Sequence, residues 1–119
     1  MTWFLAKIVY RVVCGDGAHM PQFDEQVRHV VAYNAEEALT KSRNIGLQEE
    51  EVFYNQKQQL VQWKFVDVAE LHSLDELSDG AEVYSQIKET DDAESYCRFI
   101  HHKASQLQKN FTSLNIQTV

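Results

Sequence analysis

The residue types best suited to chemistry are an acid, an imidazole and a phenol on two neighbouring segments of expected strand. Glu25 and His29 lie four residues apart, so both point to one face of a strand, and Tyr10 lies in the preceding strand. If the apolar faces of the two strands coincide, all three share a face. An acid beside an imidazole can fix its tautomer or share a proton with it. We favour the simpler interpretation, in which this end of the sheet is open to water.

The remaining histidines and cysteines form no recognised metal motif. Cys14, Asp16 and His19 flank one turn, but a fourth ligand at a standard zinc spacing is missing. His101 and His102 are neighbours, and successive helix residues point about 100° apart, so they cannot both bind one ion. Nucleophilic serine motifs and phosphate-binding glycine loops are also missing. The sequence therefore predicts no metal and no cofactor, and it leans against an enzyme.

The first half of the chain predicts two strands and a helix. Apolar residues alternate over 3–14 and 22–33, which is typical of strands, and a glycine-containing turn separates the two runs. The register that aligns their apolar faces places Arg11 near Asp24. Asn34, followed three residues later by a glutamate, has the form of a capping box that begins a helix.

The second half predicts two more strands and a second helix. Residues 60–71 are rich in strand formers on both faces, which indicates a central strand. Residues 81–89 alternate after a turn and are expected to form the fourth strand. Asp91 and Asp92 begin the last helix, where acidic groups offset the helix dipole. We expect an α+β fold, a mainly antiparallel four-stranded sheet with two helices in the order ββαββα. Residues 1–109 make one domain, and 110–119 form a tail of uncertain order.

Composition limits the partners. The 119 residues carry a formal charge of −7, which disfavours nucleic acid. The N-terminal apolar run is too short for a signal peptide, and no stretch is long enough to cross a membrane. The only cysteines, Cys14 and Cys97, are expected to be reduced, which indicates a cytoplasmic protein. An open sheet leaves a face or an edge to cover, so a homodimer is expected.

Several stretches of the first 87 residues resemble the DUF4288 family, a bacterial domain of unknown function. They are Trp3-Phe4-x-Ala6-Lys7, Phe23-Asp24-Glu25, Ala35-Glu36-Glu37-Ala38, Glu49-Glu50, Phe53-Tyr54-Asn55, Val61-Gln62-Trp63-Lys64-Phe65 and Asp79-Gly80-x-Glu82-Val83-Tyr84-Ser85. The resemblance implies a compact strand-and-helix domain without a known activity. Five residues of these stretches form a second candidate surface for a ligand or partner, namely Asn55, Trp63, Lys64, Glu82 and Tyr84. Their aromatic members are better explained as core, with a groove for a ligand or peptide as the alternative.

These observations lead to one functional expectation and two alternatives. The expectation is a small, non-enzymatic, cytoplasmic binding or interaction module that recognises a protein or a small molecule. The first alternative is a small-molecule-binding domain or small enzyme that uses Glu25, His29 and Tyr10 in a cleft between sheet and helix. The second is a purely structural homo-oligomer, which predicts a large apolar interface.

Overall fold

The computed structural model describes residues 1–75 and 78–118 as two compact units. The first, Met1–Tyr84, contains a sheet and one helix, and the second begins at Ser85 and contains the other helix. This division lies earlier in the chain than the boundary expected from the sequence. The two units are described separately below.

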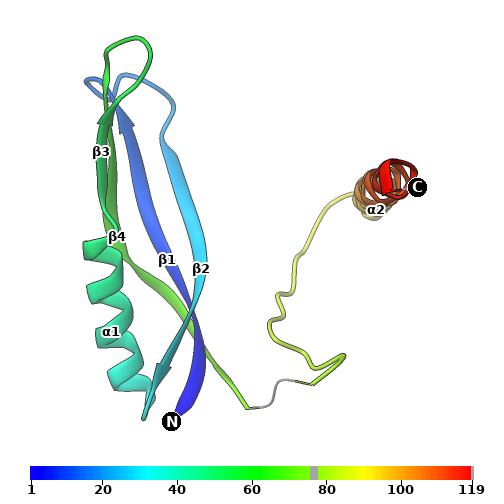
Figure 1. Cartoon of the computed structure of the whole chain (residues 1–119), viewed down its shortest axis with the longest axis horizontal. Helices are drawn as coiled ribbons and strands as arrows, with labels where there is room; N and C mark the ends of the chain where they lie inside the picture. The colour runs from blue at the N-terminus through cyan, green and yellow to red at the C-terminus, as the bar shows by residue number, and fades with distance from the viewer. Residues whose placement is uncertain (76–77, 119) are drawn as a thin grey trace. The chain divides into compact units, whose positions relative to one another are not determined.

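The first unit is built on one antiparallel sheet. Its strands are β1 (Thr2–Cys14), β2 (Gln22–Ala32), β3 (Glu51–Tyr54) and β4 (Leu60–Leu74). They lie in the order β2-β1-β4-β3, so β1 and β4 are central (Figure 1). Two register shifts interrupt the β1–β4 pairing, and such irregularities increase the twist of a sheet. The predicted α+β class and the element order ββαββα are confirmed.

The predicted fourth strand is wrong, although the count of strands is right. Residues 81–89 contain no strand, and the fourth strand is instead β3, which pairs with β4 at the edge of the sheet. β3 has only four residues, all exposed, which is too short for an alternating pattern to identify. The tight turn that joins it to β4 contains Gln58 at a φ of 63°, and the Asn55 side chain accepts hydrogen bonds from the N–H groups of Lys57 and Gln59 at 2.9 and 3.0 Å.

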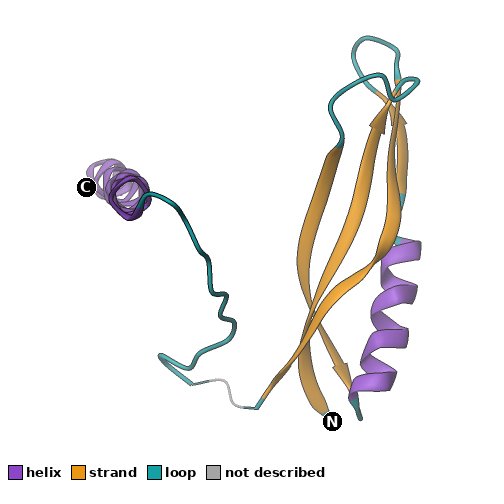
Figure 2. Ribbon diagram, turned by 180° about the vertical axis from the view of Figure 1, so that it is seen from behind, coloured by secondary structure: helices purple, strands orange, loops and turns teal. Residues whose placement is uncertain are grey.

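Helix α1 (Ala35–Gln48) covers one face of the sheet (Figure 2). Asn34 caps it as predicted, because its side-chain oxygen accepts a hydrogen bond from the Glu37 N–H at 2.8 Å. Ala38, Ser42 and Gly46 form its buried stripe. The core between helix and sheet contains Phe4, Val30, Ala32 and Ala38, with Ile45 and Leu71 packed against them. Burial of this apolar surface holds α1 against the sheet.

The C-terminal turn of α1 lies unusually close to the sheet. A Cβ atom at Gly46 would lie no more than 3.0 Å from three carbon atoms of the Phe65 ring. The Tyr10 hydroxyl, on β1, donates a hydrogen bond to the Gly46 carbonyl at 2.8 Å. Tyr10 is 1% exposed and its ring packs edge-on against Phe65. The missing side chain at Gly46 thus allows the helix end and two aromatic rings to meet.

The register of β1 with β2 differs by one residue from the predicted one. Tyr10 pairs with Asp24 and Arg11 with Phe23, so the expected Arg11–Asp24 pair does not form. A shift of one residue moves every side chain to the other face. The prediction aligned the apolar residues of both strands, but beside α1 the chain places half-buried polar residues of β2 on the helix face. Asp24 accepts hydrogen bonds from Gln26 at 2.6 Å and from Trp63 at 3.1 Å.

The second unit contains helix α2 (Ala93–Thr118). Asp92 begins it as predicted, since its Oδ1 accepts a hydrogen bond from the Ser95 N–H at 3.1 Å and its Oδ2 one from the Ser95 hydroxyl at 2.7 Å. The helix continues through most of the stretch expected to be a tail. Within the described residues, neither helix is apolar over a length that could span a bilayer.

Candidate functional site

The sheet face opposite α1 carries a cavity of about 460 Å³ at the end of the sheet that holds the N-terminus. Its walls are Trp3, Leu5, His29, Leu74 and Val83. Four of these are apolar or aromatic, and His29 adds an imidazole. The volume falls within the usual range for small-molecule sites. This apolar cavity is therefore our candidate for a binding site.

The strand register explains why these side chains gather. Leu5 of β1 pairs with His29 of β2 on one side and with His72 of β4 on the other, so the three form one row across the sheet. The next row places Trp3 beside Leu74. Rows of directly opposed residues share a face, which brings the side chains of Trp3, Leu5, His29, His72 and Leu74 to one surface. The Trp3 and His29 rings lie with their centroids 5.3 Å apart.

An ion pair borders the cavity on the same face. Lys7 Nζ lies 2.8 Å from Glu70 Oε2, and the Tyr84 hydroxyl donates a hydrogen bond to Glu70 Oε1 at 3.4 Å. The hydrogen bond from Lys7 holds the pKa of the Glu70 carboxyl below its usual value, and the same contact raises the pKa of Lys7. His72 stacks edge-on against the Tyr84 ring at 5.2 Å. The described residues give its buried Nε2 atom no hydrogen-bond partner.

The segment that follows Gly80 completes this surface from outside the sheet. Gly80 has a φ of 84°, a left-handed conformation that favours glycine, and the Ala81 N–H donates to the Ser78 carbonyl at 3.1 Å. The resulting turn brings Val83 to the cavity wall and the Tyr84 ring within 5.9 Å of Lys7 Nζ. The alternating pattern that predicted a strand here belongs to a segment without regular secondary structure, of which Val83 and Tyr84 contact the sheet face.

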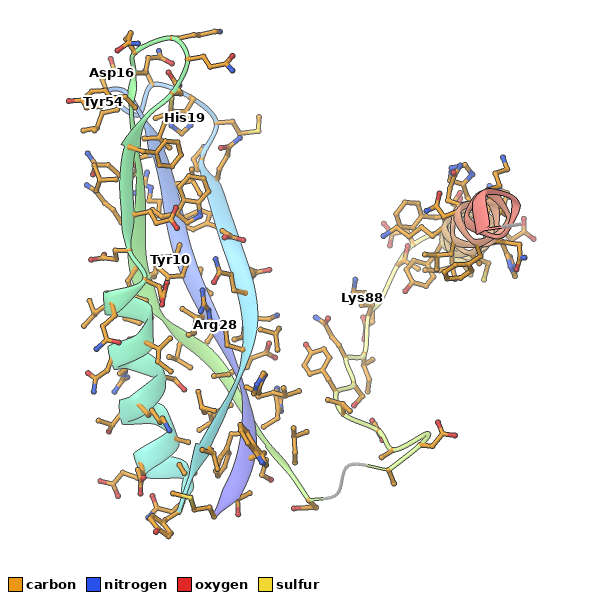
Figure 3. All side chains as sticks on the ribbon, in the orientation of Figure 1. Tyr10, Asp16, His19, Arg28, Tyr54 and Lys88 are labelled. Atoms are coloured by element: carbon orange, nitrogen blue, oxygen red, sulfur yellow. The ribbon has the colours of Figure 1, made fainter. Side chains whose placement is uncertain are left out.

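The structure does not bring the predicted trio together. His29 lines the cavity, and Glu25 lies on the same face of β2, opposite Val9. Tyr10 lies on the other face, under α1, where Figure 3 shows it beside the end of the helix. The one-residue change of register is the reason. A site that combines Tyr10 with Glu25 and His29 does not form.

The second group of predicted residues is spread over the unit. Asn55 orders the turn between β3 and β4, and Trp63 stacks on Phe53 at 5.8 Å on the α1 face. Lys64 and Glu82 are exposed. Only Tyr84 belongs to the surface around the cavity. The aromatic part of this group thus divides between packing on the α1 face and the border of the candidate site.

The turn between β1 and β2 uses its polar groups internally. His19 Nε2 accepts a hydrogen bond from the Cys14 N–H at 3.0 Å, and Asp16 accepts one from the Ala18 N–H at 2.9 Å. Figure 3 shows Asp16 and His19 near Tyr54, at the end of the sheet away from the N-terminus. In the part of the chain that is described, no three His, Cys, Asp or Glu side chains cluster so as to hold a metal ion.

Sequence reasoning missed most of the site. Lys7, Glu70 and His72 were not singled out; Glu70 lies within the strand expected over 60–71, and His72 lies one residue beyond it. The sequence feature that could have indicated this site is the odd-numbered face of β1, where Trp3 and Leu5 precede a single lysine, Lys7. Recognising it required the pairing of β1 with β4, which the sequence does not provide.

Comparison with known proteins agrees with the division of the chain. Residues 3–85 match the family model described as "Domain of unknown function (DUF4288)". The matched region ends one residue beyond the first unit, so it contains the sheet, α1 and the segment after Gly80 but not α2. No curated protein and no solved structure gave a match. The chain belongs to the DUF4288 family, and its DUF4288 domain is the unit that carries the cavity.

Proposed function

We propose that this chain is a small, non-enzymatic, cytoplasmic binding module whose cavity takes the apolar or aromatic group of a small molecule or of a partner's side chain. The observation that carries the proposal is the cavity itself, about 460 Å³ with four apolar walls and one imidazole. Burying an apolar group there is favoured by about 25 cal/mol per Å² of apolar surface removed from water. The two free cysteines of the chain, Cys14 and Cys97, are consistent with a reducing compartment.

The polar surroundings restrict the ligand. His29 can donate or accept one hydrogen bond at the cavity wall, and Lys7 is held by Glu70 beside it. A ligand that fits would have a flat or branched apolar body and one polar group able to reach His29. The separation of Tyr10 from Glu25 and His29 removes the trio on which a catalytic function rested, and so favours binding. The acid, imidazole and phenol of Glu70, His72 and Tyr84 at the border of the cavity contact one another.

The experiment is a titration of the full chain with the anionic naphthalene dye ANS, followed by ¹H–¹⁵N spectra. We expect saturable binding with shifts of the Leu5, His29 and Leu74 amides, and little change in β3. In the variant Val83→Trp the new ring occupies the cavity, so the affinity falls at least about tenfold, or about 1.4 kcal/mol. Val66→Trp is the matched control, since Val66 is an exposed valine that does not line the cavity.

Two results would contradict the proposal. One is dye binding that shifts amides elsewhere and leaves those of the cavity unchanged. The other is equal affinity of the wild type and Val83→Trp, because a filled cavity cannot accept the dye as well as an empty one.

A further inference from the structure

β2 is the long, unprotected edge of the sheet. It has eleven residues, against four for β3 at the other edge, and no described residue adds a strand to its outer side. Its pairing with β1 runs from Gln22 to Ala32 without a register shift. Proteins protect such edges with proline, lysine, bulges or inward-pointing charges. β2 has no proline, lysine or bulge, and its inward-pointing charges, Asp24 and Arg28, are hydrogen-bonded through Gln26 within the strand. The edge is therefore available to a further strand.

The sequence of β2 is complementary to itself in the antiparallel direction. When Val27 is placed opposite Val27 of a second copy, Phe23 faces Val31 and Glu25 faces His29. All of these side chains lie on the sheet face opposite α1. Phe23 and Val27 are 55% and 60% exposed in the single chain, so pairing would cover two apolar side chains of each copy. We propose that two copies join through β2 about a two-fold axis at Val27, which makes one continuous eight-stranded sheet.

The charge of Glu25 selects this register. A shift of two residues in either direction places the Glu25 carboxylate opposite an apolar side chain, Val27 or Val31. A shift of four in one direction places it opposite Glu25 of the other copy. Like charges in directly opposed positions are destabilising, and a carboxylate against valine loses its partner. Among these arrangements, only the one centred on Val27 places the Glu25 carboxylate opposite an imidazole that can donate a hydrogen bond to it.

This pairing would also complete the edge of the cavity. Within one strand Glu25 and His29 are about 13 Å apart along the backbone, too far for direct contact. Across the two-fold axis, the carboxylate of the second copy would lie beside the imidazole that lines the cavity. The acid–imidazole pair suggested by the residue types would then form between two chains. The inference concerns assembly and goes beyond the proposed binding function.

The test is sedimentation equilibrium of the full chain and of three charge variants. We expect the wild type to be a monomer–dimer system. Glu25→Lys removes both symmetry-related pairs and places ammonium groups against the imidazoles, so the dissociation constant rises about tenfold or more. Adding His29→Glu to Glu25→Lys reverses each pair and restores the dimer. Glu51→Lys is the control, because it makes the same charge change on the other edge strand.

Each outcome decides the proposal. Restoration by the double variant, with the control unchanged, supports the β2 interface. A Glu25→Lys chain that dimerises as tightly as the wild type overturns it and places self-association elsewhere. A wild type that stays monomeric up to about 1 mM also overturns it, because association of only about 4 kcal/mol would be detected there. In that case the β2 edge would be available to pair with a strand of another protein. Dye binding at the cavity is measured separately, so either proposal can fail alone.

Discussion

Replacement of Tyr10 by phenylalanine should destabilise the DUF4288 domain through the end of α1. The last four carbonyls of a helix have no partner within it. In a continuing helix the Glu50 N–H would reach Gly46, but here it donates to the Leu47 carbonyl at 3.4 Å. The Tyr10 hydroxyl supplies the missing donor to Gly46 at 2.8 Å, in a buried position. Tyr10→Phe removes this donor and keeps the ring.

The size of the effect follows from burial. A hydrogen bond contributes about 0.5–1.5 kcal/mol net, and a buried acceptor left without a partner costs about 1–3 kcal/mol. Because the helix end borders the surface, water can replace part of the loss, and we expect a decrease of about 1–2 kcal/mol in the free energy of unfolding. In a domain of this size each kcal/mol lowers Tm by about 4–8 °C.

Urea unfolding followed by tryptophan fluorescence measures this change, with Tyr54→Phe as the control. Tyr54 is 68% exposed, so loss of its hydroxyl should leave the unfolding midpoint within error. Equal midpoints for wild type and Tyr10→Phe, with unchanged slopes, would refute the assigned role of the hydroxyl.

The same tyrosine should make stability depend on alkaline pH. Burial raises the pKa of Tyr10, and the carboxylates of Glu49 and Glu50 add to the shift. A group whose folded pKa is raised stabilises the protein fully below its unfolded pKa, about 10 for tyrosine, and this contribution is lost as the pH rises through the folded value. The wild type should therefore lose stability above about pH 10 more steeply than Tyr10→Phe.

Three further changes probe other parts of the unit. Gly46→Ala should lower the free energy of unfolding by about 1–2 kcal/mol, although alanine favours helices, because the added methyl group overlaps the aromatic ring of β4 beneath it; urea unfolding measures the sign. Asn34→Ala should cost about 1 kcal/mol through loss of the cap, whereas Asn44→Ala in the same helix should not destabilise. Glu70→Gln should make the free energy of unfolding depend less on pH at acidic pH, as measured by urea unfolding over a pH series. The pKa of Glu70 is lowered by Lys7, so its contribution is present above the unfolded pKa, about 4.3, and is lost as the pH falls through the folded one.

Local sequence patterns were sufficient to predict a helix or strand wherever that element depends mainly on its own residues. Alternation gave β1 and β2, a run of strand formers on both faces gave β4, and the Asn34 and Asp92 caps gave the starts of both helices. These signals arise from contacts within a few residues. They also gave the correct fold class, because the order of elements follows from the same segments.

Pairing between segments could not be obtained in this way. The register of β1 with β2 was wrong because the prediction turned Phe23, Val27 and Val31 toward the core, whereas Val30 and Ala32 are the residues of β2 that pack there. β3 was missed because its strand geometry comes from pairing with β4. For the candidate site, sequence reasoning supplied His29 and Tyr84 but not Lys7 or Glu70, which meet only when β1 and β4 lie side by side.

The distribution of side chains along β2 explains why the open face is the better candidate for function. On the α1 face, Asp24, Gln26 and Arg28 are half-buried and hydrogen-bonded to one another. On the opposite face, Phe23 and Val27 are exposed. The same face also carries Glu25 and His29, so exposed apolar side chains lie beside groups that can form hydrogen bonds. An open face of this composition, beside a cavity and along a long free edge, is what a binding surface requires, and both proposals place their partner there.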